Sequence, residues 1–197
     1  MTDSLPTVDP RHTALLVMDF QARAIAAIND SEALLTRVAD AIAIIRGWGG
    51  QVGYVRVAFE DADYDAVPAF SRLAPFVAGG RSAHSESPAT AVHDRVAPEP
   101  GDIIVRKTRV GAFSTTDLDT QLRERSITTL ILAGITTSGV VLSTALDAHD
   151  RDYQVFVLAD ASADFQSGVH DFFIERFFPQ VAQVITVAQL PALLSGA

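Results

Sequence analysis

Three chemically useful groups follow apolar runs in this chain, each where a strand would end. Asp19 ends the run ALLVMD, Lys107 follows DIIVR, and the turn GITTSGV (134–140) follows TTLILA. The carboxyl ends of neighbouring parallel strands lie along one edge of a sheet, where open α/β folds bind their ligands. We therefore expect the carboxylate, the ammonium and the turn to share one crevice.

Lys107 is the only lysine of the chain, because arginine supplies the other 14 of the 15 basic residues. An ammonium is a compact charge, and beside a carboxylate it can hold that group's ionisation in a way that a planar guanidinium does not. This usage favours a specific role for Lys107 together with Asp19. The alternatives are a leftover surface lysine and an aspartate that only caps the segment after its strand.

The turn at 134–140 precedes an apolar helix, so its backbone N–H groups would lie at a helix N-terminus. Such groups can hold an oxyanion or a carboxylate. Thr136, Thr137 and Ser138 could equally be plain helix caps. Ser138 is a poor candidate nucleophile, because no GxSxG motif surrounds it and no base is evident.

Other residue types exclude several classes of site. The chain has no cysteine, which removes disulfides, thiolate metal sites and cysteine nucleophiles. Its five histidines are not spaced like metal ligands, so we expect neither a metal nor a cofactor. Asp61, Asp63 and Asp65 favour a solvated acidic loop over a cation site. The phenylalanines between 172 and 178 favour packing in the core or between subunits.

Strands and helices alternate from end to end, which predicts one domain over residues 1–197. The pattern is an α/β fold with a mostly parallel sheet of about six strands and helices on both faces. The irregular stretch 60–101 is predicted to be a long loop, with a short helix near 68–76. The expected strands cover 14–19, 51–59, 102–106, 128–134, 153–160 and 183–187, and the expected helices cover 34–45, 118–125, 138–149 and 169–178.

Composition limits the partners. The formal net charge is −9 over 197 residues, which argues against a nucleic-acid partner, because phosphate binding needs a basic face. No run of about 20 apolar residues could span a bilayer, and the start MTDSLPTVDP lacks the features of a secretory signal. We therefore expect a cytoplasmic protein that acts on a small molecule.

Taken together, the segments ALLVMDFQ (14–21), DIIVRKTRVGAFSTTDLDTQLRE (102–124) and LILAGITTSGVVLSTALDAHDRDYQVFVLADASAD (130–164) resemble the isochorismatase-like, or cysteine hydrolase, superfamily. The resemblance covers nearly the whole chain. It implies a single-domain, three-layer α/β/α fold with a six-stranded sheet, and a homo-oligomer, either a dimer or a tetramer. It also implies that Asp19 and Lys107 are catalytic, that the Ile135–Thr136 peptide bond is cis, and that the N–H groups of Thr136 and Val140 form an oxyanion hole.

One position departs from the amidohydrolase members of this superfamily. Val140 stands where they carry their nucleophilic cysteine, and an isopropyl group cannot attack a carbonyl. Isochorismatases are similar in lacking this cysteine, and they hydrolyse an enol ether without a covalent intermediate. By resemblance, Asp19 would be the proton donor, Lys107 would tune it, and water would attack.

We expect the substrate to be small and either anionic or carbonyl-bearing, in a pocket walled by Phe20, Gln21, Phe113 and Val140. The apolar walls would raise the pKa of Asp19, while Lys107 would lower it. Two alternatives stay open. One is a catalytically silent protein that binds a small molecule or assembles with partners, and the other is an Asp19 that acts as a covalent nucleophile.

Overall fold

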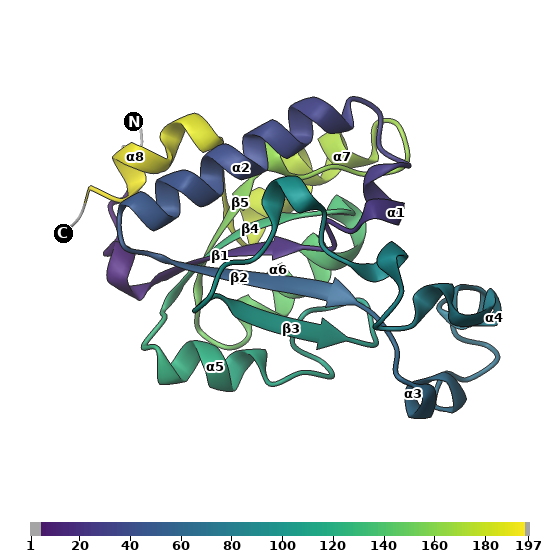
Figure 1. The fold of residues 1–197 in the computed structure, drawn as a ribbon. Helices are drawn as coiled ribbons and strands as arrows, with labels where there is room; N and C mark the ends of the chain where they lie inside the picture. The colour runs from purple at the N-terminus through teal and green to yellow at the C-terminus, as the bar shows by residue number, and fades with distance from the viewer. Residues whose placement is uncertain (1–4, 196–197) are drawn as a thin grey trace.

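The structure is a computed structural model and describes residues 5–195. Its centre is one six-stranded sheet in the order β3-β2-β1-β4-β5-β6, with every neighbouring pair parallel (Figure 1). The strands are β1 (Thr13–Met18), β2 (Gln51–Val57), β3 (Ile103–Lys107), β4 (Thr129–Gly134), β5 (Gln154–Leu158) and β6 (Gln183–Ile185). The predicted fold class, a single α/β domain with a six-stranded parallel sheet, is confirmed.

The strand order reverses direction between β1 and β4. The chain adds β2 and β3 on one side of β1, then returns to place β4 on its other side. In open parallel sheets such a switch point leaves a crevice at the carboxyl ends of the strands. Asp19 follows β1 and Ile135 follows β4, so both lie at this crevice.

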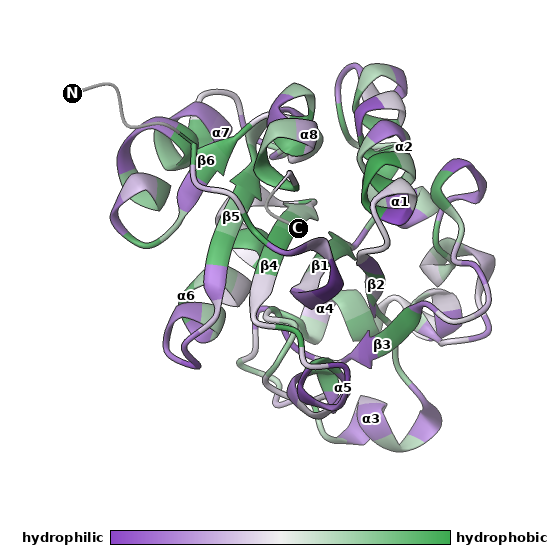
Figure 2. Ribbon diagram, turned by 90° about the vertical axis from the view of Figure 1, so that its left-hand side faces the viewer, coloured by the Kyte–Doolittle hydropathy of each residue, from purple (hydrophilic) through white to green (hydrophobic). Residues whose placement is uncertain are grey.

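Helices cover both faces of the sheet, and alternate residues of β1 explain how. Leu15 and Val17 pack in the core cluster that includes the buried face of α2 (Ser31–Gly47) and α8 (Leu190–Leu193). Leu16 and Met18 point to the other face and pack with α5 (Leu118–Glu124) and α6 (Leu142–His149). This alternation is the period of two of a strand buried on both faces. Figure 2 shows the same arrangement, with a largely hydrophobic β5 and with α2 mixed in character.

The connection between β2 and β3 is less irregular than the sequence indicates. It contains α3 (Asp61–Asp65), α4 (Ala74–Ala78) and several 3-10 turns. The short helix expected near 68–76 is α4, shifted toward the C-terminus with Pro75 in its first turn, where proline is tolerated. This connection projects beyond the carboxyl ends of β2 and β3 (Figure 1).

Two expected helices differ in detail. The helix expected at 138–149 begins with a π-helical turn, Thr137–Val141, and continues as α6. The helix expected at 169–178 is divided into α7 (Val169–Phe172), a π-helical turn and a 3-10 turn that contains Pro179. The short helix α1 (Ala22–Ile25) was not predicted. Among residues 5–195, no helix has the length and apolar character needed to cross a bilayer.

Candidate active site

Asp19 leaves β1 in a left-handed backbone conformation. Its φ is +59°, which is uncommon for a residue other than glycine but is better tolerated by aspartate than by most. The backbone N–H of Asp19 still donates to the carbonyl of Val55 on β2, at 2.8 Å. The chain therefore turns sharply at this residue while it stays bonded to the sheet.

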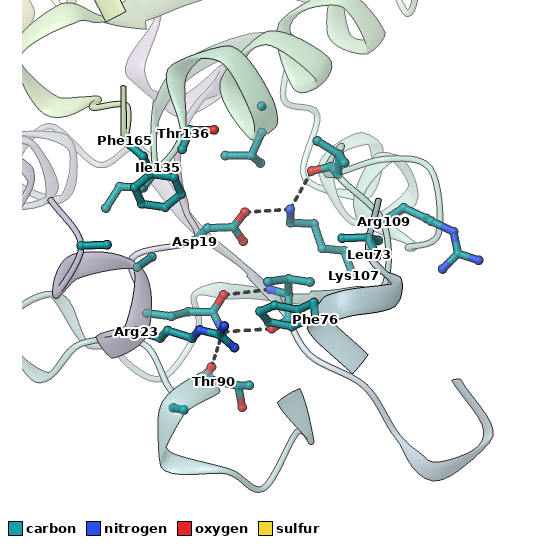
Figure 3. A pocket seen from close by; sticks show the side chains of 18 of the residues that line it. Asp19, Arg23, Leu73, Phe76, Thr90, Lys107, Arg109, Ile135, Thr136 and Phe165 are labelled. Atoms are coloured by element: carbon teal, nitrogen blue, oxygen red, sulfur yellow. Dashed lines mark hydrogen bonds and ion pairs between the residues drawn. The ribbon is translucent and has the colours of Figure 1, made fainter. Parts of the chain in front are cut away.

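Lys107 is the last residue of β3, and its side chain meets the Asp19 carboxylate. Lys107 Nζ lies 2.7 Å from Asp19 Oδ2 and donates a second hydrogen bond to the carbonyl of Val110, at 2.6 Å (Figure 3). Both side chains are almost fully buried, with 2% of Lys107 and 8% of Asp19 exposed. The pairing of these two residues, expected from their places at strand ends, is present in the structure.

The Asp19 carboxyl is electrostatically unusual. Burial raises the pKa of Asp19, and this effect outweighs the opposing attraction of the Lys107 ammonium. Asp19 Oδ1 is buried and has no hydrogen-bond partner among residues 5–195. Buried polar atoms are normally paired, so this oxygen lacks a partner that a bound proton or a ligand atom could supply.

The turn after β4 brings Thr136 and Val140 to the same pocket, and two glycines allow its close packing. The peptide bond between Ile135 and Thr136 is cis. A Cβ on Gly139 would lie 2.5 Å from Thr136 Oγ1, and one on Gly134 would lie 2.8 Å from Val141 Cγ2. These distances are shorter than van der Waals contact, so neither position accepts a side chain without movement of its neighbours.

Ser138 and Thr137 face away from the pocket and hold the turn in place. The N–H and the hydroxyl of Ser138 both donate to Asp164 Oδ2, at 2.8 and 2.7 Å. Thr137 Oγ1 lies 2.8 Å from His170 Nδ1. Ser138 does not line the pocket, so the structure gives no support to a serine nucleophile there.

The pocket has a volume of about 430 Å³, toward the small end of the range for ligand sites. The Asp19–Lys107 pair lies against walls that are mostly apolar (Figure 3). The other lining residues come from three regions: Gln21, Arg23, Ala24 and Ala27 after β1; Val57, Leu73, Phe76, Ser82, Ala89 and Thr90 from β2 and the connection to β3; and Arg109, Val110, Ile135, Thr136, Gly139, Val140 and Phe165 from later turns.

Of the four predicted wall residues, Gln21 and Val140 line the pocket, whereas Phe20 and Phe113 do not. Phe20 packs in the core cluster beneath α2, because the left-handed turn at Asp19 directs it away from the crevice. Phe113 packs in the opposite core cluster, where its ring stacks on Tyr153 with the centroids 6.1 Å apart. The apolar surroundings of Asp19 come instead from residues such as Ile135 and Val140.

Gln21 joins the strand end to the long connection. Its Nε2 donates to the carbonyls of Val57 and Thr90, at 3.0 and 2.7 Å, and its Oε1 accepts from the N–H of Val57, at 3.1 Å. All of its polar atoms are therefore used inside the protein. Gln21 shapes the pocket wall by fixing Thr90, and its amide is not available to a ligand.

Sequence reasoning missed Arg23, Arg109 and the aromatic residues Phe76 and Phe165, all of which line the pocket. A signal existed for the two arginines, because they follow Asp19 by four residues and Lys107 by two. No comparable signal existed for Phe76, which lies in the aperiodic connection.

Two of the three aspartates at the start of the connection have arginine partners, and the third, Asp65, is exposed. Asp61 lies 2.6 Å from Arg81, and Asp63 lies 2.5 Å from Arg106. Within the described part of the chain, no three acidic, histidine or cysteine side chains are grouped so that they could hold a metal ion. These contacts favour the solvated acidic loop over the cation site.

Comparison with known proteins agrees with this geometry. Residues 13–189 match the model of the isochorismatase domain. The chain is 30% identical over 182 residues to "Uncharacterized isochorismatase family protein YwoC" of Bacillus subtilis, covering 92% of this chain and 94% of that protein. It is 34% identical over 187 residues to "Probable isochorismatase" of Pseudomonas chlororaphis, covering 93% of this chain and 87% of that protein.

Solved structures give the same result. An isochorismatase family protein from Burkholderia thailandensis superposes with a TM-score of 0.83 at 29% identity, and the match covers 97% of this chain and 99% of that one. The domain match extends over β1 to β6, and so over every strand end that contributes to the pocket. The chain therefore belongs to the isochorismatase family of hydrolases.

Proposed function

We propose that this protein hydrolyses a small molecule by general acid catalysis, with Asp19 as the proton donor, Lys107 as its charge partner and water as the attacking group. The Asp19 carboxyl carries this proposal. Its Oδ2 is bound to Lys107, while its Oδ1 is buried at the pocket without a hydrogen-bond partner among residues 5–195. The raised pKa of Asp19 favours the protonated form that a general acid needs.

The reaction that fits this acid is the hydrolysis of an enol ether. Asp19 gives its proton to the terminal vinyl carbon, which leaves an oxocarbenium ion. Water adds to the cationic carbon and returns a proton to the Asp19 carboxylate. The hemiketal then moves its hydroxyl proton to the ether oxygen as that C–O bond breaks, which releases an alcohol and a ketone.

Lys107 and the turn after β4 have supporting roles in this scheme. The ammonium holds Asp19 through Oδ2 and stabilises the carboxylate that forms when the proton leaves. The backbone N–H groups of Thr136 and Val140 are assigned to the oxygen of the hemiketal. Val140 carries no nucleophile, and the pocket lining includes neither histidine nor cysteine among the described residues, so no thiol or imidazole is available there to attack in place of water.

The test uses a simple enol ether, 2-phenoxyacrylate, which would give phenol and pyruvate. We expect the wild-type chain to release pyruvate, and in D₂O to place one deuterium in its methyl group. Asp19→Asn should lower the rate by at least about a hundredfold, the scale of general acid catalysis, and Lys107→Met should lower it as well. Unchanged turnover in both folded variants would remove these residues from the mechanism. An ester on Asp19 detected by mass spectrometry would contradict attack by water.

A second candidate is a protein that binds a small molecule without turning it over. The observation in its favour is Val140, a hydrocarbon side chain that is only 3% exposed at the pocket wall. Val140→Cys separates the candidates. Amidase activity gained by this variant would indicate an otherwise complete amidohydrolase site, whereas a wild-type chain that binds ligands but turns over none would favour the binding protein.

A further inference from the structure

The pocket has a charge opposite to that of the whole protein. The chain carries a formal net charge of −9, yet the charged residues that line the pocket are Asp19, Lys107, Arg23 and Arg109. An ionised Asp19 cancels the charge of Lys107, which lies 2.7 Å away, and a protonated Asp19 leaves the pocket more positive still. The two arginines therefore leave an excess of positive charge at the pocket of an acidic protein, and such a local field favours an anionic ligand.

The two arginines differ in what their guanidinium groups already bind. Arg109 donates to the carbonyls of Thr108 and Ala66, at 2.7 and 3.3 Å. Arg109 thus ties the connection between β2 and β3 to the turn after β3. Arg23 has neither a hydrogen bond nor an ion pair within residues 5–195, although it lines the same pocket. Its N–H donors are open to a ligand.

Aromatic contacts hold Arg23 in position. Its guanidinium carbon lies 4.9 Å from the ring centroid of Phe76, within the range of a cation–π contact. Phe76 packs in turn against Phe59, with the ring centroids 6.0 Å apart, and Phe59 is completely buried. Figure 3 shows Arg23 and Phe76 together at one side of the pocket. This contact restrains the exposed Arg23 side chain near the pocket, and a guanidinium whose N–H groups have no partner among the described residues can bind a carboxylate through two hydrogen bonds.

The rest of the pocket limits the shape of that anion. Leu73, Phe76, Ile135, Val140 and Phe165 give the lining a mostly apolar surface. The volume of about 430 Å³ suits a compact molecule better than a nucleotide-sized one. A ligand that satisfies both features has one carboxylate and a small apolar body.

We infer that Arg23 is the specificity-determining residue of this pocket, and that it binds the carboxylate of a small, mostly apolar ligand. The assignment rests on the proposed function only in taking this pocket as the substrate site. Binding of the carboxylate by Arg23 requires no turnover, so it can be tested separately from the roles of Asp19 and Lys107.

The experiment compares benzoate with benzamide, a neutral molecule of nearly the same shape, by NMR titration of the full chain. We expect wild type to bind benzoate at least about tenfold more tightly than benzamide, and the preference to weaken as salt is added. Arg23→Gln should lose about tenfold in benzoate affinity and little in benzamide affinity. Arg23→Lys should recover only part of the lost benzoate affinity, because an ammonium lacks the planar set of N–H donors with which a guanidinium binds both carboxylate oxygens.

Two controls separate a local contact from a change in overall charge. Arg125→Gln makes the same charge change at an exposed residue just after α5, whose guanidinium binds the carbonyl of Gln121, and it should leave both affinities unchanged. Arg109→Gln should weaken benzoate binding less than Arg23→Gln does.

Three results would overturn the assignment: equal affinity for the two probes, benzoate affinity unchanged in Arg23→Gln, and no benzoate binding to wild type at up to about 10 mM. Failure of the Asp19 variants to affect turnover would leave this result intact, so the two proposals fail independently.

Discussion

Asp19 and Lys107 form their ion pair although they belong to strands that do not pair with each other. Strand β2 lies between β1 and β3. The Lys107 side chain reaches past the carboxyl end of β2 and brings its Nζ within 2.7 Å of Asp19 Oδ2. The same Nζ binds the carbonyl of Val110. One buried ammonium therefore joins the exits of two strands and the turn that follows the second.

Removal of Lys107 should strongly destabilise the fold. In Lys107→Met the buried carboxyl of Asp19 loses its charge partner, and breaking a buried pair from one side costs about 3–5 kcal/mol. The double variant Asp19→Asn, Lys107→Met should recover part of this loss, because no charge is left without a partner. Urea unfolding at neutral pH measures both. A double variant no more stable than Lys107→Met would show that the loss comes from packing instead.

The raised pKa of Asp19 predicts how stability depends on pH. Because its pKa in the folded protein lies above the ordinary value of 3.8, the folded state holds this proton more tightly than the unfolded state does. The contribution of Asp19 to the free energy of unfolding is therefore greatest below about pH 3.8, and it falls as the pH rises through the pKa of Asp19 in the folded protein.

The measurement is the difference in unfolding free energy between wild type and Asp19→Asn, taken by urea unfolding from below about pH 3.8 to neutral pH. The other titrating groups are common to both chains and cancel. The unfolding free energy of wild type minus that of Asp19→Asn should decrease as the pH rises and then level off. An increase of this difference with pH would mean that the attraction of Lys107 outweighs the effect of burial on the pKa of Asp19. If Asp19 is the proton donor, turnover should fall over the same pH interval.

Gln21→Leu should both destabilise the protein and loosen the pocket wall. The substitution leaves the N–H and the carbonyl of Val57 without the partner that Gln21 provides, and each such loss costs about 1–3 kcal/mol. The carbonyl of Thr90 loses one of its two donors and keeps the other, Arg56, at 3.2 Å. Hydrogen exchange should also increase in the segment around Thr90. Gln121→Leu is the matched control. Gln121 bonds Asp117 on the surface of α5, so its loss should change stability by no more than about 0.5 kcal/mol. Equal effects at the two positions would contradict the role given to Gln21.

Gly134→Ala and Gly47→Ala should change stability in opposite directions. A Cβ on Gly134 would meet Val141 Cγ2 at 2.8 Å and Val140 Cγ1 at 3.2 Å, and overpacking of this kind costs about 1–3 kcal/mol. Gly47 ends α2, and a Cβ there meets nothing within 4 Å, so alanine should stabilise by about 0.5–1 kcal/mol. Thermal unfolding of both variants tests this. A neutral Gly134→Ala would show that the turn bearing Val140 can shift.

The sheet could be predicted because buried parallel strands appear as short, continuous apolar runs. The run at 14–19 corresponds to β1 (Thr13–Met18), and the other five runs also became strands. The Phe-rich helix was predicted as one element, but π-helical and 3-10 turns interrupt it. Helical periodicity alone does not register such local changes of turn, since the apolar spacing is nearly the same.

The pocket residues that could be predicted lie at strand ends or in the turns that directly follow them. Asp19 and Lys107 were found in this way, because parallel topology brings strand ends to one edge. Phe20 was misplaced, because an alternating pattern cannot show that the residue before it is left-handed. Phe76 could not be found, because its place at the pocket depends on contacts between α4 and residues distant in sequence. The expected oligomer and cytoplasmic location stay predictions.

The pocket is formed by two parts of the chain, the ends of core strands and the long connection between β2 and β3. The acid and the ammonium are fixed by strands in the core, whereas Leu73, Phe76, Ser82, Ala89 and Thr90 come from the connection between β2 and β3. This division makes the fold modular. Exchanging residues 60–90 for the equivalent stretch of a relative would replace part of the wall around a ligand, while Asp19, Lys107 and Arg23 lie outside this stretch and stay in place. Gln21 and Arg109 bond to this stretch, so the graft has to keep both contacts.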